Sequence, residues 1–296
     1  MDYFMVAKMT SYPSDSFKAS SIGVAPYSYT KWWLRPRTHD RLPLYWHLIS
    51  RAFALAMWAI PRRYRFSAAL RLARVSNPIV RRLPWYRARR ELRIDGVSEI
   101  ALYHALEIMS NSGALFDPVL DVEGAEIFYN ALSSDQGVLV TAPHALLNLL
   151  VPRNLYDAGY IPTVISSSSS IHLYGTRLFA HTIRPSPTFM IRLRSVLRSG
   201  GVVCAMVDGR HATKQKLIQF PTVEGPMYIS DAMFRLALRC NARILFVSVR
   251  VDQRRGLLLT VAEPATSPCL TVETITSDCI AFIQAHIAAV ASSAGK

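Results

Sequence analysis

From residue 98 onward, short runs rich in β-branched residues alternate with stretches that have the apolar spacing of a helix. This alternation limits the possible folds more than any other feature of the sequence. Short apolar runs bounded by turn residues favour strands, whereas apolar residues at intervals of three and four favour helices. Strands that alternate with helices predict an α/β fold, in which a mostly parallel central sheet is flanked by helices on both faces.

The predicted elements follow one another closely along the chain. Strands are expected at residues 119–122, 138–141, 163–166, 202–207, 244–251 and 257–261. Helices are expected at residues 98–110, 188–198, 230–240 and 272–291. Sheets of this class bind ligands at the carboxyl ends of their strands. Functional side chains are therefore expected directly after strands.

Composition is consistent with a large folded core. Hydrophobic residues make up 51% of the 296 residues and the mean hydropathy is +0.18, which excludes a wholly disordered chain. Residues 1–30 have scattered Ser and Pro and no signal-peptide pattern, and we expect a disordered arm there. Residues 31–97 are expected to form a basic, amphipathic, membrane-associating helical segment and residues 98–296 the α/β domain, with 31–296 as one structural unit.

The formal charge of +14 is concentrated in one segment. Residues 31–93 hold sixteen Lys or Arg against two acids, Asp40 and Glu91, and the rest of the chain is net neutral. Clustered positive charge attracts anionic membranes, acidic proteins or nucleic acid. No RNP, zinc-finger or helix-turn-helix pattern accompanies the charge, and we expect no nucleic acid partner.

The apolar run at residues 42–60 (LPLYWHLISRAFALAMWAI) lies inside this basic segment. A spanning helix needs about 20 mostly apolar residues, and a central arginine such as Arg51 costs roughly 2.5 to 3.5 kcal/mol on insertion scales. Arginines and aromatic residues border the run, which is typical of a helix that lies on a membrane surface. The alternative is an ordinary helix whose arginines reach out from a protein core.

Two polar clusters follow predicted strands. The first ends in His144 (TAPH) and the second contains Asp208, Gly209 and Arg210 (DGRH). A histidine has an unperturbed pKa of about 6.5 and suits general base chemistry when it faces a cleft, although most single histidines are packing or surface residues. Gly209 permits a sharp exit from a strand, and Arg210 suits bidentate binding of phosphate or carboxylate; the alternative is a solvated turn.

Residues 42–251 resemble the lipid A biosynthesis acyltransferase family, the lysophospholipid-acyltransferase-like group of bacterial late acyltransferases. The stretches that carry the resemblance are LPLYWHLISRAFALAMWAIPRRYRF, GVLVTAPHALLNLL, LRSGGVVCAMVDGR and FPTVEGPMYISDAMFRLALRCNARILFVSV, in this order. The resemblance implies transfer of a fatty acyl group from an acyl-carrier-protein or coenzyme A thioester to a hydroxyl or amine of a lipid-like or small acceptor. It also implies an enzyme at the cytoplasmic face of the inner membrane, peripheral or monotopic.

In the family's scheme a histidine takes the acceptor's proton, and an acid five residues later orients the ring. His144 matches this histidine, but Leu149 stands where the acid is expected. Three replacements are open: Asn148 through its amide oxygen if a helix begins near residue 145, Asp208, or Asp157. An alternative function also follows from Leu149, because a catalytically silent relative that binds acyl chains, carrier protein or anionic membrane would not need the acid.

The remaining candidates concern binding. Asp208, Gly209 and Arg210 resemble the family's second block, and Arg177 and Arg184 are candidates for holding a phosphate on a substrate. An acidic carrier protein would suit the basic charge of residues 62–93. The four cysteines have no CxxC spacing and are interpreted as buried free thiols. A pantetheine thioester needs no metal, and we expect no metal or redox cofactor.

Overall fold

All residues that the computed structural model describes belong to one compact unit, Tyr45–Lys296. Described are residues 52, 55–56, 58–80, 82, 96–111, 120–165, 172–173, 176–177, 181–209, 217–222, 225–265 and 270–294. The predicted arm at 1–30, most of the basic segment, and Arg210 lie outside these residues.

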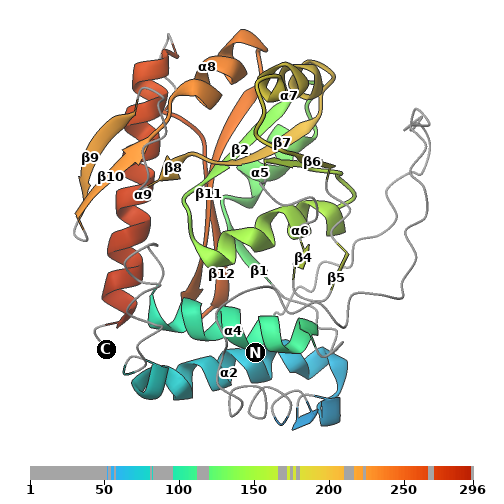
Figure 1. Ribbon diagram of the computed structural model, residues 1–296, viewed down its shortest axis with the longest axis vertical. Helices are drawn as coiled ribbons and strands as arrows, with labels where there is room; N and C mark the ends of the chain where they lie inside the picture. Colours follow the sequence, from blue (N-terminus) through green and yellow to red (C-terminus); the bar gives the residue numbers. More distant parts are fainter. Residues whose placement is uncertain are drawn as a thin grey trace, which may run out of the picture. The chain divides into compact units, whose positions relative to one another are not determined.

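A seven-stranded sheet runs through the described part of the chain (Figure 1). Its strand order is β1-β12-β11-β2-β7-β3-β6. The bounds are β1 Leu120–Glu123, β2 Val138–Ala142, β3 Thr163–Ile165, β6 His181–Ile183, β7 Val202–Met206, β11 Arg243–Asp252 and β12 Gly256–Ala262. All six predicted strands are present, each within two residues of its expected ends, and β6 is an addition at the edge.

Five neighbouring strands, from β11 to β6, run parallel to one another, whereas β12 is antiparallel to β11 and β1 is parallel to β12. The reversal arises at the short link between β11 and β12. Asp252 Oδ1 accepts hydrogen bonds from the backbone N–H groups of Arg254 and Arg255, both at 2.8 Å, and Gly256 has a φ of 86°. So short a link permits only a hairpin, because a parallel return needs a crossover of about a dozen residues. The predicted α/β fold with a mostly parallel sheet is confirmed.

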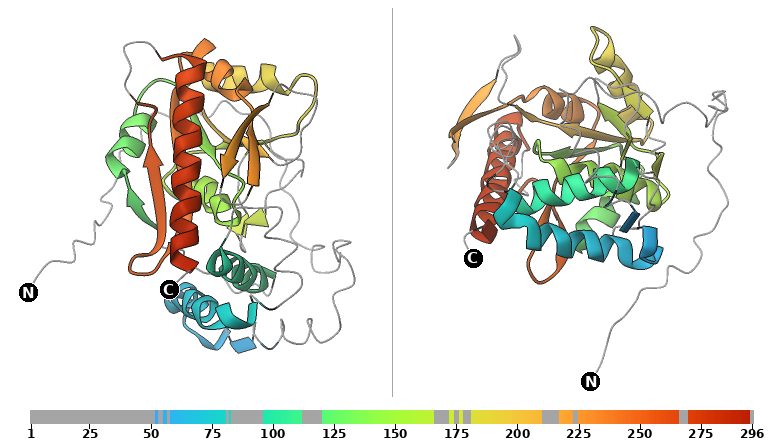
Figure 2. Two further views of the ribbon diagram at one scale, coloured as in Figure 1. Left: turned by 90° about the vertical axis from the view of Figure 1, so that its left-hand side faces the viewer. Right: turned by 60° about the horizontal axis from the view of Figure 1, so that its bottom comes forward.

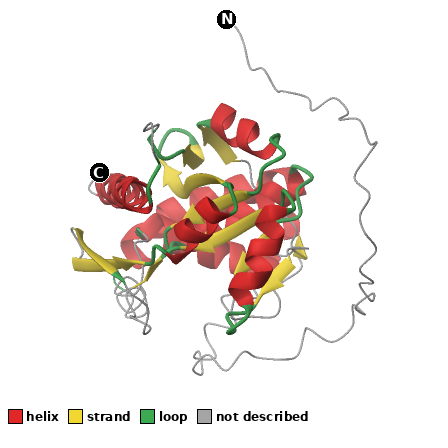
Figure 3. Cartoon of the chain, turned by 90° about the horizontal axis from the view of Figure 1, so that it is seen from above, coloured by secondary structure: helices red, strands yellow, loops and turns green. Residues whose placement is uncertain are grey.

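Helices cover both faces of this sheet, as Figures 1 and 3 show. Residues of β11 alternate between the two faces: Val247 and Val249 belong to the core shared with α2, α4, α5 and α6, and Ile244 and Phe246 to the core shared with α7, α8 and α9. This period of two is that of a strand buried on both faces. The bounds are α2 Arg62–Val80, α4 Val97–Asn111, α5 Ala125–Leu132, α6 Leu150–Asp157, α7 Phe189–Arg198, α8 Ala232–Arg239 and α9 Val272–Ala294.

The long C-terminal helix α9 crosses the second face of the sheet (Figure 2). Its buried stripe consists of Ile275, Cys279, Ile283, Ile287 and Val290. Among the described helices, only α9 has, over Val272–Ser292, the length and composition to cross a membrane, a test that core helices of soluble proteins also pass. The stripe repeats every three or four residues, which is the pattern of a helix packed on a core through one face.

Two smaller sheets complete the described fold. β8 (Asp208–Gly209), β10 (Gly225–Ile229) and β9 (Ile218–Thr222) form an antiparallel sheet of order β8-β10-β9, and β4 (His172–Leu173) pairs with β5 (Thr176–Arg177). These strands were not predicted, because β4 and β5 have only two residues each and β8, β9 and β10 contain Pro or Gly. The 3₁₀ helix η2 (Leu146–Leu149) precedes α6. An α-helix that begins near residue 145, which Asn148 would need in order to reach the His144 ring, is therefore absent at this point of the described chain.

Gly137, just before β2, lies against the last turn of α7. A Cβ at this position would lie 2.1 Å from the carbonyl oxygen of Leu197 in the last turn of α7. The atoms that this Cβ would meet all belong to the backbone of Leu197, so a side chain at position 137 forces the helix away from β2.

We expect Gly137→Ala to lower the free energy of unfolding by about 1–3 kcal/mol, the usual cost of overpacking a core. Chemical denaturation of the two proteins measures this. Ser199→Ala, at an exposed position just after the same helix, is the control and should change stability by about 0.5 kcal/mol or less. Equal stability of Gly137→Ala and the parent chain would contradict the close contact.

Candidate functional site

The candidate site forms where two adjacent parallel strands end. β2 and β7 pair in register, with Ala142 opposite Met206, and their residues are almost all buried. His144 stands two residues after β2, and Asp208 stands two residues after β7. Equal offsets from paired strand ends bring the two side chains to the same edge of the sheet.

One carboxylate oxygen of Asp208 binds His144 twice. Asp208 Oδ1 lies 3.0 Å from the ring atom Nδ1 of His144 and accepts the backbone N–H of His144 at 2.7 Å. The Asp208 side chain is only 1% exposed, whereas the His144 side chain is 49% exposed. With the proton on Nδ1, the contact to Asp208 is a hydrogen bond and Nε2 carries the free lone pair. His144 is therefore a base that a buried carboxylate orients and that is half exposed to solvent.

The small sheet β8-β10-β9 holds Asp208 in place. Asp208 pairs with Ile229 of β10, and the carbonyl oxygen of Val207 accepts the N–H of Ser230 at 3.0 Å. The carboxylate of Asp208 is buried on the side that faces away from the His144 ring. Its second oxygen, Oδ2, is buried without a hydrogen-bond partner in the described part of the chain.

The thiol of Cys279 on α9 lies in the electrostatic field of the Asp208 carboxylate. Burial raises the pKa of Cys279 well above its ordinary value, and the negative charge of Asp208 raises it further. The thiol therefore stays neutral and adds no second negative charge beside the carboxylate. Burial likewise raises the pKa of Cys204 to about 12. Cys204 and Cys279 are free and buried, as predicted, whereas Cys240 is free but only partly buried and Cys269 lies outside the described residues.

Asn148 has a different role from the predicted one. Its side chain is buried, its Nδ2 donates to the carbonyl oxygen of Pro143 at 2.7 Å, and its Oδ1 accepts the N–H of Val249 at 2.6 Å. The prediction that this oxygen binds the ring of His144 is therefore corrected. The cause is η2: a 3₁₀ helix has about three residues per turn, so the residue four after His144 does not return to its side. Asn148 instead fastens the His144 loop to β11.

The other two replacements for the missing acid are separated by their positions. Asp157 lies at the end of α6 and pairs with Arg153 at 3.3 Å, whereas Asp208 contacts His144. Leu149 is partly buried and packs against the hydrophobic core. Among the three candidates, the structure places Asp208 beside the ring.

The predicted binding residues are only partly described. Gly209 pairs with Tyr228 in the small sheet, and Arg177 belongs to β5, with its side chain outside the described atoms. Arg184 follows β6 and is exposed. The structure therefore brings His144, Asp208 and Gly209 together, and phosphate binding by Arg177 and Arg184, and phosphate or carboxylate binding by Arg210, stay predictions.

Two buried titratable groups away from this site went unpredicted. Burial raises the pKa of Glu99 on α4, whose Oε1 accepts the N–H of Val251 at 3.1 Å. Burial, and then the charge of Arg250, lowers the pKa of His286 on α9 to about 4. His286 is therefore neutral at pH 7. No periodic pattern distinguishes such residues from ordinary polar positions of a helix.

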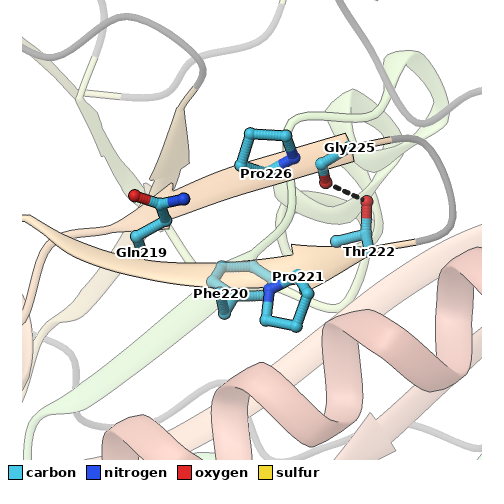
Figure 4. A pocket seen from close by; sticks show the side chains of 6 residues that line it. All are labelled: Gln219, Phe220, Pro221, Thr222, Gly225 and Pro226. Carbon is cyan, nitrogen blue, oxygen red and sulfur yellow. Dashed lines mark hydrogen bonds between the residues drawn. The ribbon is translucent and has the colours of Figure 1, made fainter.

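A shallow pocket of about 430 Å³ lies over the β9–β10 hairpin (Figure 4). Thr222 and Gly225 close the hairpin through a hydrogen bond of 2.7 Å from Oγ1 to the carbonyl oxygen. Gly225 is four residues before Ile229, the partner of Asp208, which is about 13 Å along a strand. Another lining residue, Gln219, pairs with Tyr228, the partner of Gly209, so the lining extends from the hairpin turn toward the candidate site.

Comparisons with known proteins leave the family open: no family model matches the chain, and no curated protein matches it. Within the described residues, no group of three His, Cys, Asp or Glu side chains is arranged to hold a metal ion. The geometry of His144 and Asp208 is therefore the starting point for a functional proposal.

We expect Asn148→Leu to lower the free energy of unfolding by about 1–3 kcal/mol, because it leaves the buried N–H of Val249 without its acceptor. The carbonyl oxygen of Pro143 keeps a second donor, the N–H of Ala145 at 2.8 Å. Thermal denaturation monitored by circular dichroism measures the loss. Asn130→Leu, an exposed asparagine of α5, is the matched control and should change stability little. Equal melting temperatures of both variants and the parent chain would show that Asn148 does not fasten the His144 loop.

Proposed function

We propose that this protein is an acyltransferase that moves a fatty acyl group from an acyl-carrier-protein or coenzyme A thioester to a hydroxyl or amine acceptor, with His144 as the general base. One observation carries the proposal: a half-exposed histidine receives the buried carboxylate of Asp208 on Nδ1 and leaves Nε2 open. The acyl thioester as substrate comes from the resemblance of residues 42–251 to the late acyltransferases.

The proposed reaction uses Nε2 twice. Nε2 takes the proton of the acceptor hydroxyl or amine while the acceptor atom attacks the thioester carbonyl carbon. The carbon–sulfur bond then breaks, and the departing thiolate takes the proton back from the imidazolium. Asp208 stabilises the imidazolium between these steps and keeps the ring oriented. Atoms and charges balance without a further reactant.

The silent alternative rested on Leu149, and Asp208 weakens that argument. A ring partner supplied by β8 makes an acid at position 149 unnecessary. The alternative keeps its own prediction, which is binding of acyl chains, carrier protein or membrane without turnover.

We expect His144→Ala to lower the rate of acyl transfer by about 10²–10⁴-fold, the usual contribution of a general base. Asp208→Asn should lower it by a comparable factor, because an amide does not stabilise the imidazolium. Transfer of a radiolabelled acyl group from its thioester gives the rates. Asp157→Asn, whose partner Arg153 lies elsewhere, is the control and should retain full activity.

Transfer that survives His144→Ala unchanged would remove His144 from the mechanism. A parent chain that binds the acyl thioester and never turns it over would support the silent alternative.

We expect Leu149→Asp to reduce stability without raising activity. Leu149 packs against the core, so a carboxylate there loses solvation, and Asp208 already occupies the ring nitrogen. Denaturation and the same transfer assay test both parts. Activity that appears only in Leu149→Asp would show that the natural chain is silent.

We also propose that α2 lies on an anionic membrane at the cytoplasmic face. Its inner stripe, Phe66, Ala69 and Ala73, is buried, whereas Val75 is 77% and Ile79 66% exposed on the outer side. Arg71, four residues before Val75, is exposed on the same side, and Arg62 and Arg63 are exposed at the start of the helix. Exposed apolar side chains beside arginines are typical of helices that lie in a membrane interface.

Val75→Asp combined with Ile79→Asp should reduce binding to vesicles that contain anionic lipid by at least about tenfold, because each side chain contributes up to about 1.5–3 kcal/mol when buried. Flotation with the vesicles measures this. Ile161→Asp, at an apolar residue 57% exposed after α6, is the control. Equal flotation of all variants would exclude α2 as the membrane contact. Binding to nucleic acid that weakens steeply with salt would indicate nucleic acid as the partner instead.

A further inference from the structure

The chain between Asp157 and Asp208 contains no acidic residue and five arginines. The sequence outside residues 31–93 is net neutral, so this stretch is a local excess of positive charge. Three of the arginines lie on α7 and one follows β6 directly. The positive charge is therefore gathered around one helix.

The outer face of α7 combines this charge with one apolar side chain. Leu193 and Leu197 are buried against the sheet, whereas Ile191 is 69% exposed. Arg194 and Arg198 follow Ile191 at spacings of three and seven, and so lie on its side of the helix. No ion pair involves Arg184, Arg192, Arg194 or Arg198 among the described residues. The four guanidinium groups are available to an external partner.

The chain connectivity brings the start of α7 to the edge of the candidate site. β6 and β7 both run parallel to β3, and α7 connects them. A helix in such a connection begins at the carboxyl ends of the strands, where His144 and Asp208 also stand. Arg184 and the first turn of α7 therefore lie at the same sheet edge as the proposed base.

We infer that Arg184, Ile191, Arg192, Arg194 and Arg198, here called the α7 surface, dock the acidic carrier protein that delivers the acyl thioester. This inference rests on the proposed function. Complementary charge speeds encounter and selects the partner, and an exposed isoleucine among arginines offers an apolar contact at the centre of a charged rim. The surface differs from α2, where exposed apolar residues predominate as a membrane requires.

The test measures binding of a purified acidic acyl carrier protein that bears an acylated phosphopantetheine arm. Arg192→Glu combined with Arg194→Glu should raise the Kd about tenfold or more, because two attractive contacts become repulsive. Arg254→Glu combined with Arg255→Glu changes the net charge equally at two exposed arginines of the β11–β12 turn and should leave the Kd within about twofold. Ile191→Ala should raise the Kd without changing the charge.

Transfer from an acyl-pantetheine thioester that lacks the protein should stay at the parent rate in all of these variants. An unchanged Kd in the Arg192→Glu and Arg194→Glu variant, or an equal loss in the control pair, would overturn the inference. So would loss of anionic vesicle binding with carrier binding intact, which would make α7 a membrane contact.

His144→Ala separates the two proposals. This variant should bind the carrier protein with the parent Kd while it loses transfer. If it transfers normally while the α7 variants lose carrier binding, the surface stands and the catalytic assignment of His144 fails.

Discussion

The carboxylate of Asp208 is the contact on which the geometry of the candidate site depends. It accepts both the backbone N–H and the ring nitrogen of His144, so one oxygen fixes the position of the loop and the rotation of the imidazole together. A carboxylate that is 1% exposed needs such partners, because burial of an unpaired charge is costly. The same contact that pairs Oδ1 of Asp208 therefore orients His144 for proton transfer.

Much of the fold and both residues of this pair were predictable, but not their contact. Wholly apolar runs such as VLV before His144 and VVCAM before Asp208 identified the central strands, and the rule that ligands lie at strand ends selected both residues. The pairing itself was not predictable, because it depends on β2 and β7 being neighbours in register, which no local pattern records. Asp208 was one of three alternatives for that reason.

Asn148 shows the opposite case. An amide four residues after a histidine suggests a shared helix face, but Pro143 and the following 3₁₀ turn place it against β11, where it pairs two backbone groups. Helix type at a chain entry depends on tertiary packing more than on residue preference. The sequence of β8, β9 and β10 was equally uninformative, because strands of two to five residues with Pro and Gly resemble loops.

The origin of the carboxylate also changes what the site depends on. An acid on the same helical segment as the histidine would move with it, and local structure would preserve the pair. Asp208 instead arrives from another strand, is held through β10 by Ile229, and lies near the buried thiol of Cys279 on α9. The orientation of His144 is therefore coupled to the small sheet and to the C-terminal helix, elements far from it in sequence. Changes in the packing of α9 or the β9–β10 hairpin act on the base through Asp208, whereas the opposite core acts on it through Asn148.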